Sequence, residues 1–320
     1  MPISIVVHGG AGDIAADYYD IARQGCQEAA LVGWRVLQAG GSALDAVEAA
    51  VRVLEDNPAY NAGTGACLSI EGNIELDAGI MDGRTLNLGA IAGVELIKNP
   101  ISLARQVLAS QHVMLLGRGA EQFAAEHGIL QCEFEELLTA RQYARWKAYL
   151  HTRGVTFEDE PHIVRENEPS MIRREVSVLP ARGEEQKHGT VGAVAVDSTG
   201  AIAAATSTGG IHNKYPGRVG DSPLVGCGFY ADELAGVSCT GDGEDFVRLM
   251  IAKRATDYVA QGLSASEAAK AAIAFLGAKA TGTGGLILVD ASGGVGFAWN
   301  TQHLAHAYMT EGMDEPVARI

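Results

Sequence analysis

The composition of the chain changes from charged to apolar at His188-Gly189-Thr190-Val191-Gly192-Ala193-Val194-Ala195-Val196-Asp197. From Thr190 to Val196 almost every side chain is apolar, which predicts a strand buried on both faces of a sheet. Ser198-Thr199-Gly200 predicts a turn, and residues 201–206 continue as a second apolar strand. We therefore expect a hairpin in the core. A second hairpin of the same kind is expected at residues 285–290 and 295–300.

The segment before this strand, residues 157–189, has the opposite composition. It holds 13 charged residues and three of the nine prolines of the chain, and it has no sustained apolar period. Such a composition predicts a flexible linker. A structureless stretch of this length is uncommon inside a compact domain. We expect it to interrupt one structural domain and not to separate two.

The rest of the chain alternates between strand-like and helix-like patterns. A strand at residues 3–7 leads to a glycine-rich turn at His8-Gly9-Gly10-Ala11-Gly12. Further strands are expected at 66–70, 74–81, 88–96 and 113–117. Helices are expected at 19–39, from Ser42 to before Pro58, and at 100–109, 119–127, 133–150, 244–260 and 265–276. This order predicts helices layered outside stacked sheets.

Composition limits the partners and the location of the protein. Over 320 residues, Lys plus Arg is 24 and Asp plus Glu is 39, so the formal net charge is −15. This charge argues against a nucleic-acid partner or an anionic membrane surface, since both attract basic faces. No apolar run approaches the roughly 20 residues of a membrane span. The five cysteines form no C-x-x-C pair, which fits a reducing cytoplasm.

The junction Gly189-Thr190 suggests chemistry. A threonine that opens a strand is usually just a β-branched residue in its preferred setting. Here it follows a glycine and a charged, flexible segment, so its hydroxyl could attack the carbonyl of Gly189. The resulting ester would hydrolyse and leave Thr190 as a new N-terminus. A terminal threonine carries a nucleophile and a base in one residue, because its α-amine has a pKa of about 7.7–8.0.

Six motifs occur in an order that resembles a known family. They are His8-Gly9-Gly10-Ala11-Gly12, Asn61-Ala62-Gly63-Thr64-Gly65, His188-Gly189-Thr190-Val191-Gly192, Thr206-Ser207-Thr208-Gly209-Gly210, Pro216-Gly217-Arg218-Val219-Gly220-Asp221-Ser222-Pro223 and Thr240-Gly241-Asp242-Gly243-Glu244. Together they resemble the plant-type asparaginases, also called isoaspartyl peptidases, of the N-terminal nucleophile hydrolase superfamily. The resemblance implies an αββα four-layer sandwich and self-cleavage between Gly189 and Thr190. It also implies an α subunit (1–189) and a β subunit (190–320), which assemble as an (αβ)2 heterotetramer.

The resemblance also implies roles for individual residues. Thr190 would attack the side-chain amide of asparagine, or the β-linked peptide bond of an isoaspartyl dipeptide, to form an aspartyl ester. The other implied roles are Thr208 to tune the nucleophile, Thr240 and Gly241 to form the oxyanion hole, Asn61 to support the site, and Arg218, Asp221 and Gly243 to bind substrate. No cofactor is expected for catalysis. A structural sodium ion is implied at the backbone carbonyls of Leu54, Glu55, Asn57, Tyr60, Ala62 and Thr64.

Three other functions stay open. A glycosylasparaginase-like amidase, acting on sugar-linked asparagine, would share the fold and the terminal threonine. A serine hydrolase would use Ser207 with His303, since Ala205-Thr206-Ser207-Thr208-Gly209 is close to a nucleophile elbow. A non-enzymatic module would use Arg218 and Asp221 only to bind an amino acid. Asp242, near the oxyanion turn, either disfavours acidic substrates or points to solvent.

Overall fold

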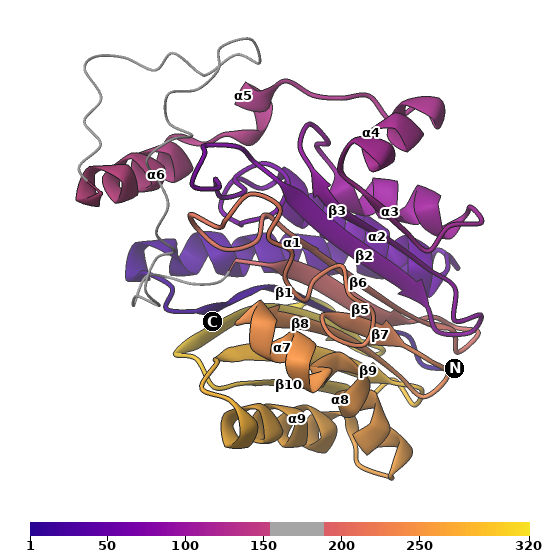
Figure 1. Cartoon of the computed structure of the whole chain (residues 1–320). Coiled ribbons are helices and arrows are strands. Elements are labelled where there is room, and N and C mark those ends of the chain that lie inside the picture. Colours follow the sequence, from indigo (N-terminus) through magenta and orange to yellow (C-terminus); the bar gives the residue numbers. More distant parts are fainter. Residues whose placement is uncertain (154–188) are drawn as a thin grey trace.

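A central eight-stranded sheet organises the computed structural model, which describes residues 1–153 and 189–320 (Figure 1). Apart from Gly189, the predicted linker lies outside the described residues. The predicted hairpin is confirmed as β5 and β6 in the middle of this sheet. In sheet order the strands are β12 (Val317–Arg319), β11 (His303–Thr310), β1 (Ser4–Gly12), β5 (Val191–Val196), β6 (Ile202–Thr208), β2 (Leu76–Asp82), β3 (Leu88–Val94) and β4 (Met114–Leu116).

A second sheet has four strands and packs against the first. Its order is β10 (Val295–Trp299), β9 (Gly284–Asp290), β8 (Ala235–Gly241) and β7 (Phe229–Ala231). The β9–β10 pair is the second predicted hairpin, which is also confirmed. Apolar side chains from both sheets fill the space between them, among them Val6, Val194, Phe229 and Ile287. A Cβ on Gly79 would lie 2.2 Å from the ring of Phe229, so the glycine makes room for the ring.

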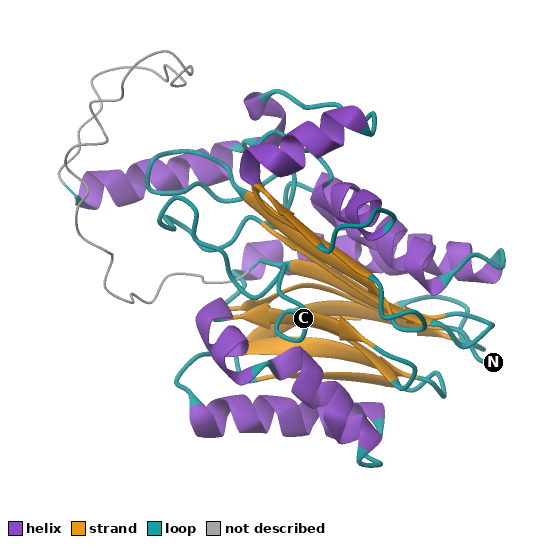
Figure 2. Ribbon diagram, turned by 45° about the vertical axis from the view of Figure 1, so that its right-hand side comes forward, coloured by secondary structure: helices purple, strands orange, loops and turns teal. Residues whose placement is uncertain are grey.

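Helices cover the outer faces of the two sheets (Figures 1 and 2). The helices α1 (Tyr19–Gln38), α2 (Ala43–Asp56) and α3 (Pro100–Leu108) contact the eight-stranded sheet, and α8 (Ile251–Ala260) and α9 (Ala265–Lys279) contact the four-stranded sheet. The other helices are η1 (Ala16–Tyr18), α4 (Gly117–Glu126), α5 (Phe134–Leu137), α6 (Ala140–Thr152) and α7 (Gly243–Leu249). None of the described helices is long and apolar enough to cross a membrane.

Local signals set the ends of several helices. The Ser42 hydroxyl accepts a hydrogen bond from Asp45 N at 3.1 Å and so caps α2, as predicted. This helix ends at Asp56, before Pro58. Helix α9 begins with a full capping box between Ser264 and Glu267.

The predicted glycine-rich turn at residues 8–12 is wrong. Strand β1 continues through this segment to Gly12, where it pairs with β11. A bulge between His8 and Ala11, with Gly10 at a φ of 107°, absorbs the irregularity without ending the strand. Long-range pairing with β11 therefore overrides the local turn signal.

Three further predictions of extent are wrong. Residues 66–70 form no strand, because their backbone groups bond to loops, as in the bond from Ile70 N to Lys214 O. The helix predicted at 133–150 is two helices, α5 and α6, and the hydroxyl of Thr139 caps the second one. The helix predicted at 244–260 breaks at Met250, which adopts a left-handed conformation with a φ of 50°.

Phe229→Ala tests the packing between the sheets. Phe229 is completely buried, so its truncation leaves a cavity that two sheets cannot both close. We expect the free energy of unfolding, measured by urea titration, to fall by about 3–5 kcal/mol. Leu130→Ala is the control, since Leu130 is 86% exposed. A similar small loss in both variants would contradict the packing described above.

Candidate active site

Thr190 and Thr208 meet where the β5–β6 hairpin opens. Val191 pairs with Ser207 across the two strands, so Thr190 comes to lie beside Thr208. Their hydroxyl oxygens are 3.0 Å apart, within hydrogen-bond distance, and both side chains are buried. The Thr208 oxygen also accepts a hydrogen bond from Gly210 N at 3.0 Å. The pairing places one hydroxyl directly against the predicted nucleophile.

Asn61 joins the two segments that carry these threonines. Its N–H donates to the Gly189 carbonyl at 3.1 Å, and its own carbonyl accepts from Gly209 N at 2.8 Å. The side-chain amide donates to Gly210 O at 2.7 Å, and Oδ1 accepts from Cys67 N at 2.7 Å. A Cβ on Gly189 would lie 2.7 Å from the Cβ of Asn61, so this close approach requires glycine. Asn61 thus fixes the carbonyl that precedes Thr190.

Thr240 lies on the face of β8 that is directed at the eight-stranded sheet. Ser238, two residues earlier on the same face, bonds to His8 Nε2 at 2.9 Å. The Thr240 hydroxyl accepts a hydrogen bond from Ala11 N at 3.3 Å. Gly241 follows, and a Cβ there would lie 2.5 Å from the ring of Phe246. Both residues of the predicted oxyanion hole therefore lie at the end of β8, between the sheets.

Asp242 does not point simply to solvent. Its Oδ2 accepts a hydrogen bond from Thr283 N at 2.7 Å. The carboxylate therefore holds the turn that leads into β9.

Arg218 forms a two-pronged ion pair with Glu244, a partner that the sequence did not predict. Its Nε lies 3.0 Å from Glu244 Oε1, and one terminal nitrogen lies 2.8 Å from Oε2. Gly243 lies between Arg218 and Asp221, because a Cβ there would be 2.9 Å from a polar atom of each. Burial raises the pKa of Asp221 to about 7, although the Arg218 guanidinium opposes this rise. Asp221 Oδ2 has no hydrogen-bond partner among the described residues.

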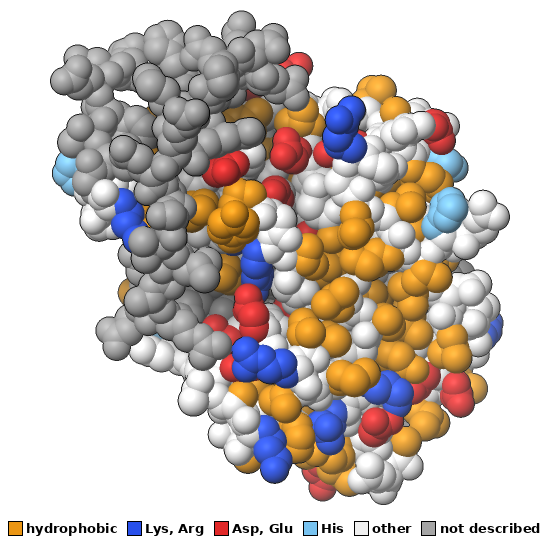
Figure 3. All heavy atoms as spheres, in the orientation of Figure 1, with side chains coloured by type: hydrophobic (Ala, Val, Ile, Leu, Met, Phe, Trp, Pro, Cys, Tyr) orange, Lys and Arg blue, Asp and Glu red, His pale blue; other side chains and the backbone are white. Residues whose placement is uncertain are grey.

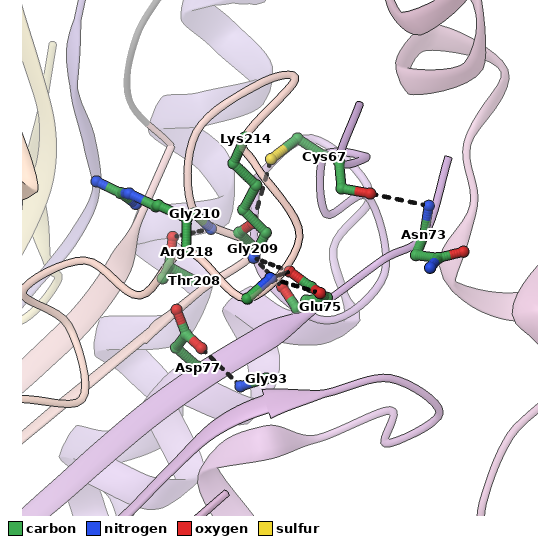
Figure 4. Close-up of polar contacts among 12 residues, drawn as sticks. Cys67, Asn73, Glu75, Asp77, Gly93, Thr208, Gly209, Gly210, Lys214 and Arg218 are labelled. Atoms are coloured by element: carbon green, nitrogen blue, oxygen red, sulfur yellow. Dashed lines mark hydrogen bonds and ion pairs between the residues drawn. The ribbon is translucent and has the colours of Figure 1, made fainter. Parts of the chain in front are cut away.

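A buried charged cluster lies beside these residues (Figure 4). Lys214 Nζ donates to the Glu75 carbonyl at 2.8 Å and lies 3.4 Å from Glu75 Oε2. Asp77, two residues after Glu75 and within β2, is completely buried. None of these three residues is predicted from the sequence as part of the site. The sequence holds a signal for two of them, because the acids Glu75 and Asp77 interrupt an otherwise apolar run at alternate positions.

The structure does not bring Ser207 and His303 together. The two nitrogens of His303 bond to Ile14 N at 3.2 Å and to the Tyr19 hydroxyl at 2.9 Å. Strands β1 and β5 lie between β11, which carries His303, and β6, which carries Ser207. The serine-hydrolase pair is therefore not assembled.

The residues of the predicted sodium loop run from Leu54 and Glu55, in the last turn of α2, to Thr64. Three of the six carbonyls already accept one backbone hydrogen bond each, namely Glu55 from Thr64, Leu54 from Asn57, and Asn57 from Tyr60. The described residues contain no group of three or more His, Cys, Asp or Glu side chains that could hold a metal ion.

Two stacked sheets, outer helices and a threonine at the start of a central strand are typical of the N-terminal nucleophile hydrolases. A model of the family described as Asparaginase matches residues 1–318, and the chain belongs to this family, as the motifs predicted. The chain is 46% identical to the plant-type L-asparaginase of Pyrococcus horikoshii, covering 99% of this chain and 100% of that protein. It is 46% identical to the enzyme of the same name from Thermococcus kodakarensis, with 99% of each chain covered.

Animal relatives carry a second name. The isoaspartyl peptidase/L-asparaginase of Mus musculus is 42% identical over 96% of this chain and 88% of its own length. The protein of the same name from Bos taurus is 41% identical over 97% of this chain and 94% of its own. Since these relatives are hydrolases by name, the chain is an enzyme and not a mere binding module.

Asn61→Ala tests the junction that holds Gly189. The change removes two side-chain hydrogen bonds and leaves buried Gly210 O and Cys67 N without those partners. We expect the free energy of unfolding to fall by about 2–4 kcal/mol. Asn87→Ala, at an exposed position, should change it by less than about 0.5 kcal/mol in the same urea titration. Equal stability of the two variants would argue against this role for Asn61.

Proposed function

We propose that this protein cleaves itself between Gly189 and Thr190 and then hydrolyses isoaspartyl dipeptides and the side-chain amide of L-asparagine. The observation that carries the proposal is the junction itself. The Gly189 carbonyl accepts a hydrogen bond from Asn61 N, and the Thr190 hydroxyl lies 3.0 Å from that of Thr208. The names of the relatives supply the substrates.

Self-cleavage converts Thr190 into the catalytic residue. Its hydroxyl attacks the Gly189 carbonyl, and the C–N bond breaks as the ester forms, which frees the α-amine. Water then hydrolyses the ester and releases the Thr190 hydroxyl and the Gly189 carboxylate. The freed α-amine is then the base for turnover, because a terminal amine has a pKa near neutral, unlike a lysine. Thr208, bonded to the attacking oxygen, stabilises its negative charge.

Substrate binding follows from the charges near Thr190. Arg218 binds the α-carboxylate with two parallel hydrogen bonds, and Asp221 accepts from the α-ammonium. Gly243 leaves the space between them open. Thr190 then attacks the side-chain carbonyl, and the Thr240 hydroxyl and Gly241 N–H stabilise the oxyanion. Ammonia or the peptide amine leaves, and water hydrolyses the aspartyl ester.

We also propose that the described layers form an αββα sandwich that stays intact after cleavage. Residues 1–189 and 190–320 would remain together as α and β subunits, since β1 and β5 are hydrogen-bonded neighbours. An (αβ)2 assembly is supported by the gathering of hydrophobic side chains around β2, β3 and β7 (Figure 3). A cytoplasmic location is supported by the five cysteines, all of which are free.

A structural sodium ion is proposed at the loop that precedes Gly65. A Cβ on Gly65 would lie 2.7 Å from Pro58 O and 2.8 Å from Tyr60 O, so the loop forms a cradle of carbonyl oxygens. Carbonyls that already accept one hydrogen bond keep a second lone pair, and a hard cation prefers such oxygen ligands. When bound, the ion would hold the loop that presents Asn61. The ion takes no part in the chemistry.

Thr190→Ala tests the nucleophile. On a denaturing gel the wild-type chain should give fragments of about 20 and about 14 kDa, in proportion to 189 and 131 residues of a 33.4 kDa chain. The variant should give one band and release no ammonia from asparagine. Ser207→Ala is the matched control and should mature and turn over normally. N-terminal sequencing of an active small fragment that did not begin T-V-G-A would refute the assignment.

The pH dependence of kcat/KM tests Asp221. Both Asp221 and the Thr190 amine act unprotonated, and burial raises the pKa of Asp221 to about 7. Below both pKa values kcat/KM should fall about a hundredfold per pH unit, because two protons must be lost. Asp221→Asn should lower kcat/KM and reduce this slope to about tenfold per unit. An unchanged slope in the variant would show that Asp221 does not titrate in this range.

A further inference from the structure

Three side chains form a row across β5, β6 and β2. Thr190 lies beside Thr208, and the register of the next strand pair places Asp77 directly opposite Thr208. Cross-strand neighbours on one face of a sheet have Cβ atoms about 4.5–5.5 Å apart. The row therefore begins at the predicted nucleophile and ends at a carboxylate.

Asp77 is held from one side only. Its Oδ1 accepts a hydrogen bond from Gly93 N at 2.9 Å. Gly93 has a φ of 63° and lies at an irregularity in the β2–β3 register, which frees this N–H for the side chain. Oδ2 is buried and has no hydrogen-bond partner among the described residues. In Figure 4 this second oxygen points toward Thr208.

The nearby cations are engaged elsewhere. Lys214 Nζ contacts Glu75, and Arg218 pairs with Glu244. Among the residues that the structure describes, none forms an ion pair with Asp77, although Lys214 and Arg218 are close enough to lower its pKa. Burial is the larger effect and raises that pKa above the ordinary value for an aspartate. A buried carboxylate oxygen without a partner is costly to keep, so it calls for a functional explanation.

The uncleaved chain lacks the base that the mature enzyme has. Before cleavage the nitrogen of Thr190 belongs to a peptide bond and cannot take the hydroxyl proton. Thr208 is bonded to that hydroxyl and already accepts from Gly210 N. If Thr208 also accepts the Thr190 proton, its own hydrogen must pass to another acceptor. The unpaired oxygen of Asp77 is next in the row.

We propose that Asp77 receives the proton of Thr190 through the Thr208 hydroxyl, and through at most one water, during self-cleavage. The inference rests on the proposed function. Thr190 Oγ1 bonds to the Gly189 carbon while its proton moves to Thr208 and the Thr208 proton moves to Asp77. The Gly189–Thr190 C–N bond then breaks, and the proton returns along the row to the leaving nitrogen. Water hydrolyses the ester, and Asp77 is a carboxylate again.

This arrangement makes Asp77 a positioning residue for maturation, since it acts through Thr208. Once the α-amine of Thr190 is free, that amine takes the proton in each turnover. Loss of the Asp77 charge therefore slows maturation far more than it slows kcat of the mature enzyme. A purely structural role would affect both steps, or stability, to a similar degree.

The test uses Asp77→Asn, which keeps the size of the side chain and an oxygen for Gly93 N. Full-length chain is made by pulsed cell-free synthesis, and cleavage is followed on denaturing gels. We expect the cleavage half-time to lengthen by about a hundredfold or more, as for loss of a general base. Asp82→Asn, at the other end of β2, is the control and should cleave at the wild-type rate. Cleavage of Asp77→Asn within threefold of wild type would overturn the proposal.

The pH dependence of wild-type cleavage gives a second readout, which holds even if Asp77→Asn fails to fold. The unprotonated carboxylate is the active form, so the rate should fall about tenfold per pH unit below its raised pKa. Glu75, Lys214, Arg218 and Asp221 surround Asp77, and each is left intact in this measurement. A rate that is flat from pH 8 down to pH 4 would overturn the proposal.

A double-mutant cycle with Thr208→Val tests the route. If Asp77 acts through Thr208, the double variant should cleave as slowly as the slower single variant, and additive effects would refute the relay. Thr190→Ala separates this inference from the function on which it rests. If Asp77→Asn cleaves normally and Thr190→Ala does not, only the relay fails. If Thr190→Ala cleaves as well, the proposed function fails.

Discussion

The hydrogen bonds of Asn61 are the constraint on which the site depends. Through its backbone, this residue ties the carbonyl before Thr190 to the segment that follows Thr208. Its side chain ties the same segment to Cys67. Because the bonds are buried, a partner that moved away would leave polar groups without water or protein to replace it. The two threonines therefore have a fixed relation even though the segment that leads to Gly189 is rich in charge.

Strands that are apolar on both faces can be predicted from the sequence, because that composition indicates burial on both sides of a sheet. The runs around β5, β6, β9 and β10 are apolar on both faces, and both predicted hairpins are confirmed. The glycine-rich segment at residues 8–12 could not be read in this way, because its structure depends on pairing with β11, about 300 residues away. The break at Met250 also escaped prediction, since nothing in the local helical pattern requires a left-handed residue there.

The residues of the site also fall into those that the sequence predicts and those that it does not. Thr190 is predicted from the glycine and the charged segment before it, and the resemblance of motifs adds to that prediction. Arg218 and Asp221 are predicted through the resemblance alone. Glu244, Lys214 and Asp77 are not predicted. The acid at position 77 stands out in an apolar run, but the partners that give these three residues a role come only from the fold. Glu244 matters because its carboxylate pairs with the Arg218 guanidinium. Asp77 matters because the strand register places it opposite Thr208.

The Thr190 hydroxyl must lose its proton in two reactions, self-cleavage and turnover. Different groups are available to accept that proton in each reaction. The mature N-terminus brings its own amine to Thr190, but that amine is created by the reaction that needs it. A fixed carboxylate one strand beyond Thr208 can accept the proton during self-cleavage, because it is present before the amine is formed. The cost of burying Asp77 is then set against a step that occurs once in the life of each chain. Asp77 can serve this step because the strand register places it opposite Thr208, one strand beyond the hairpin that carries Thr190.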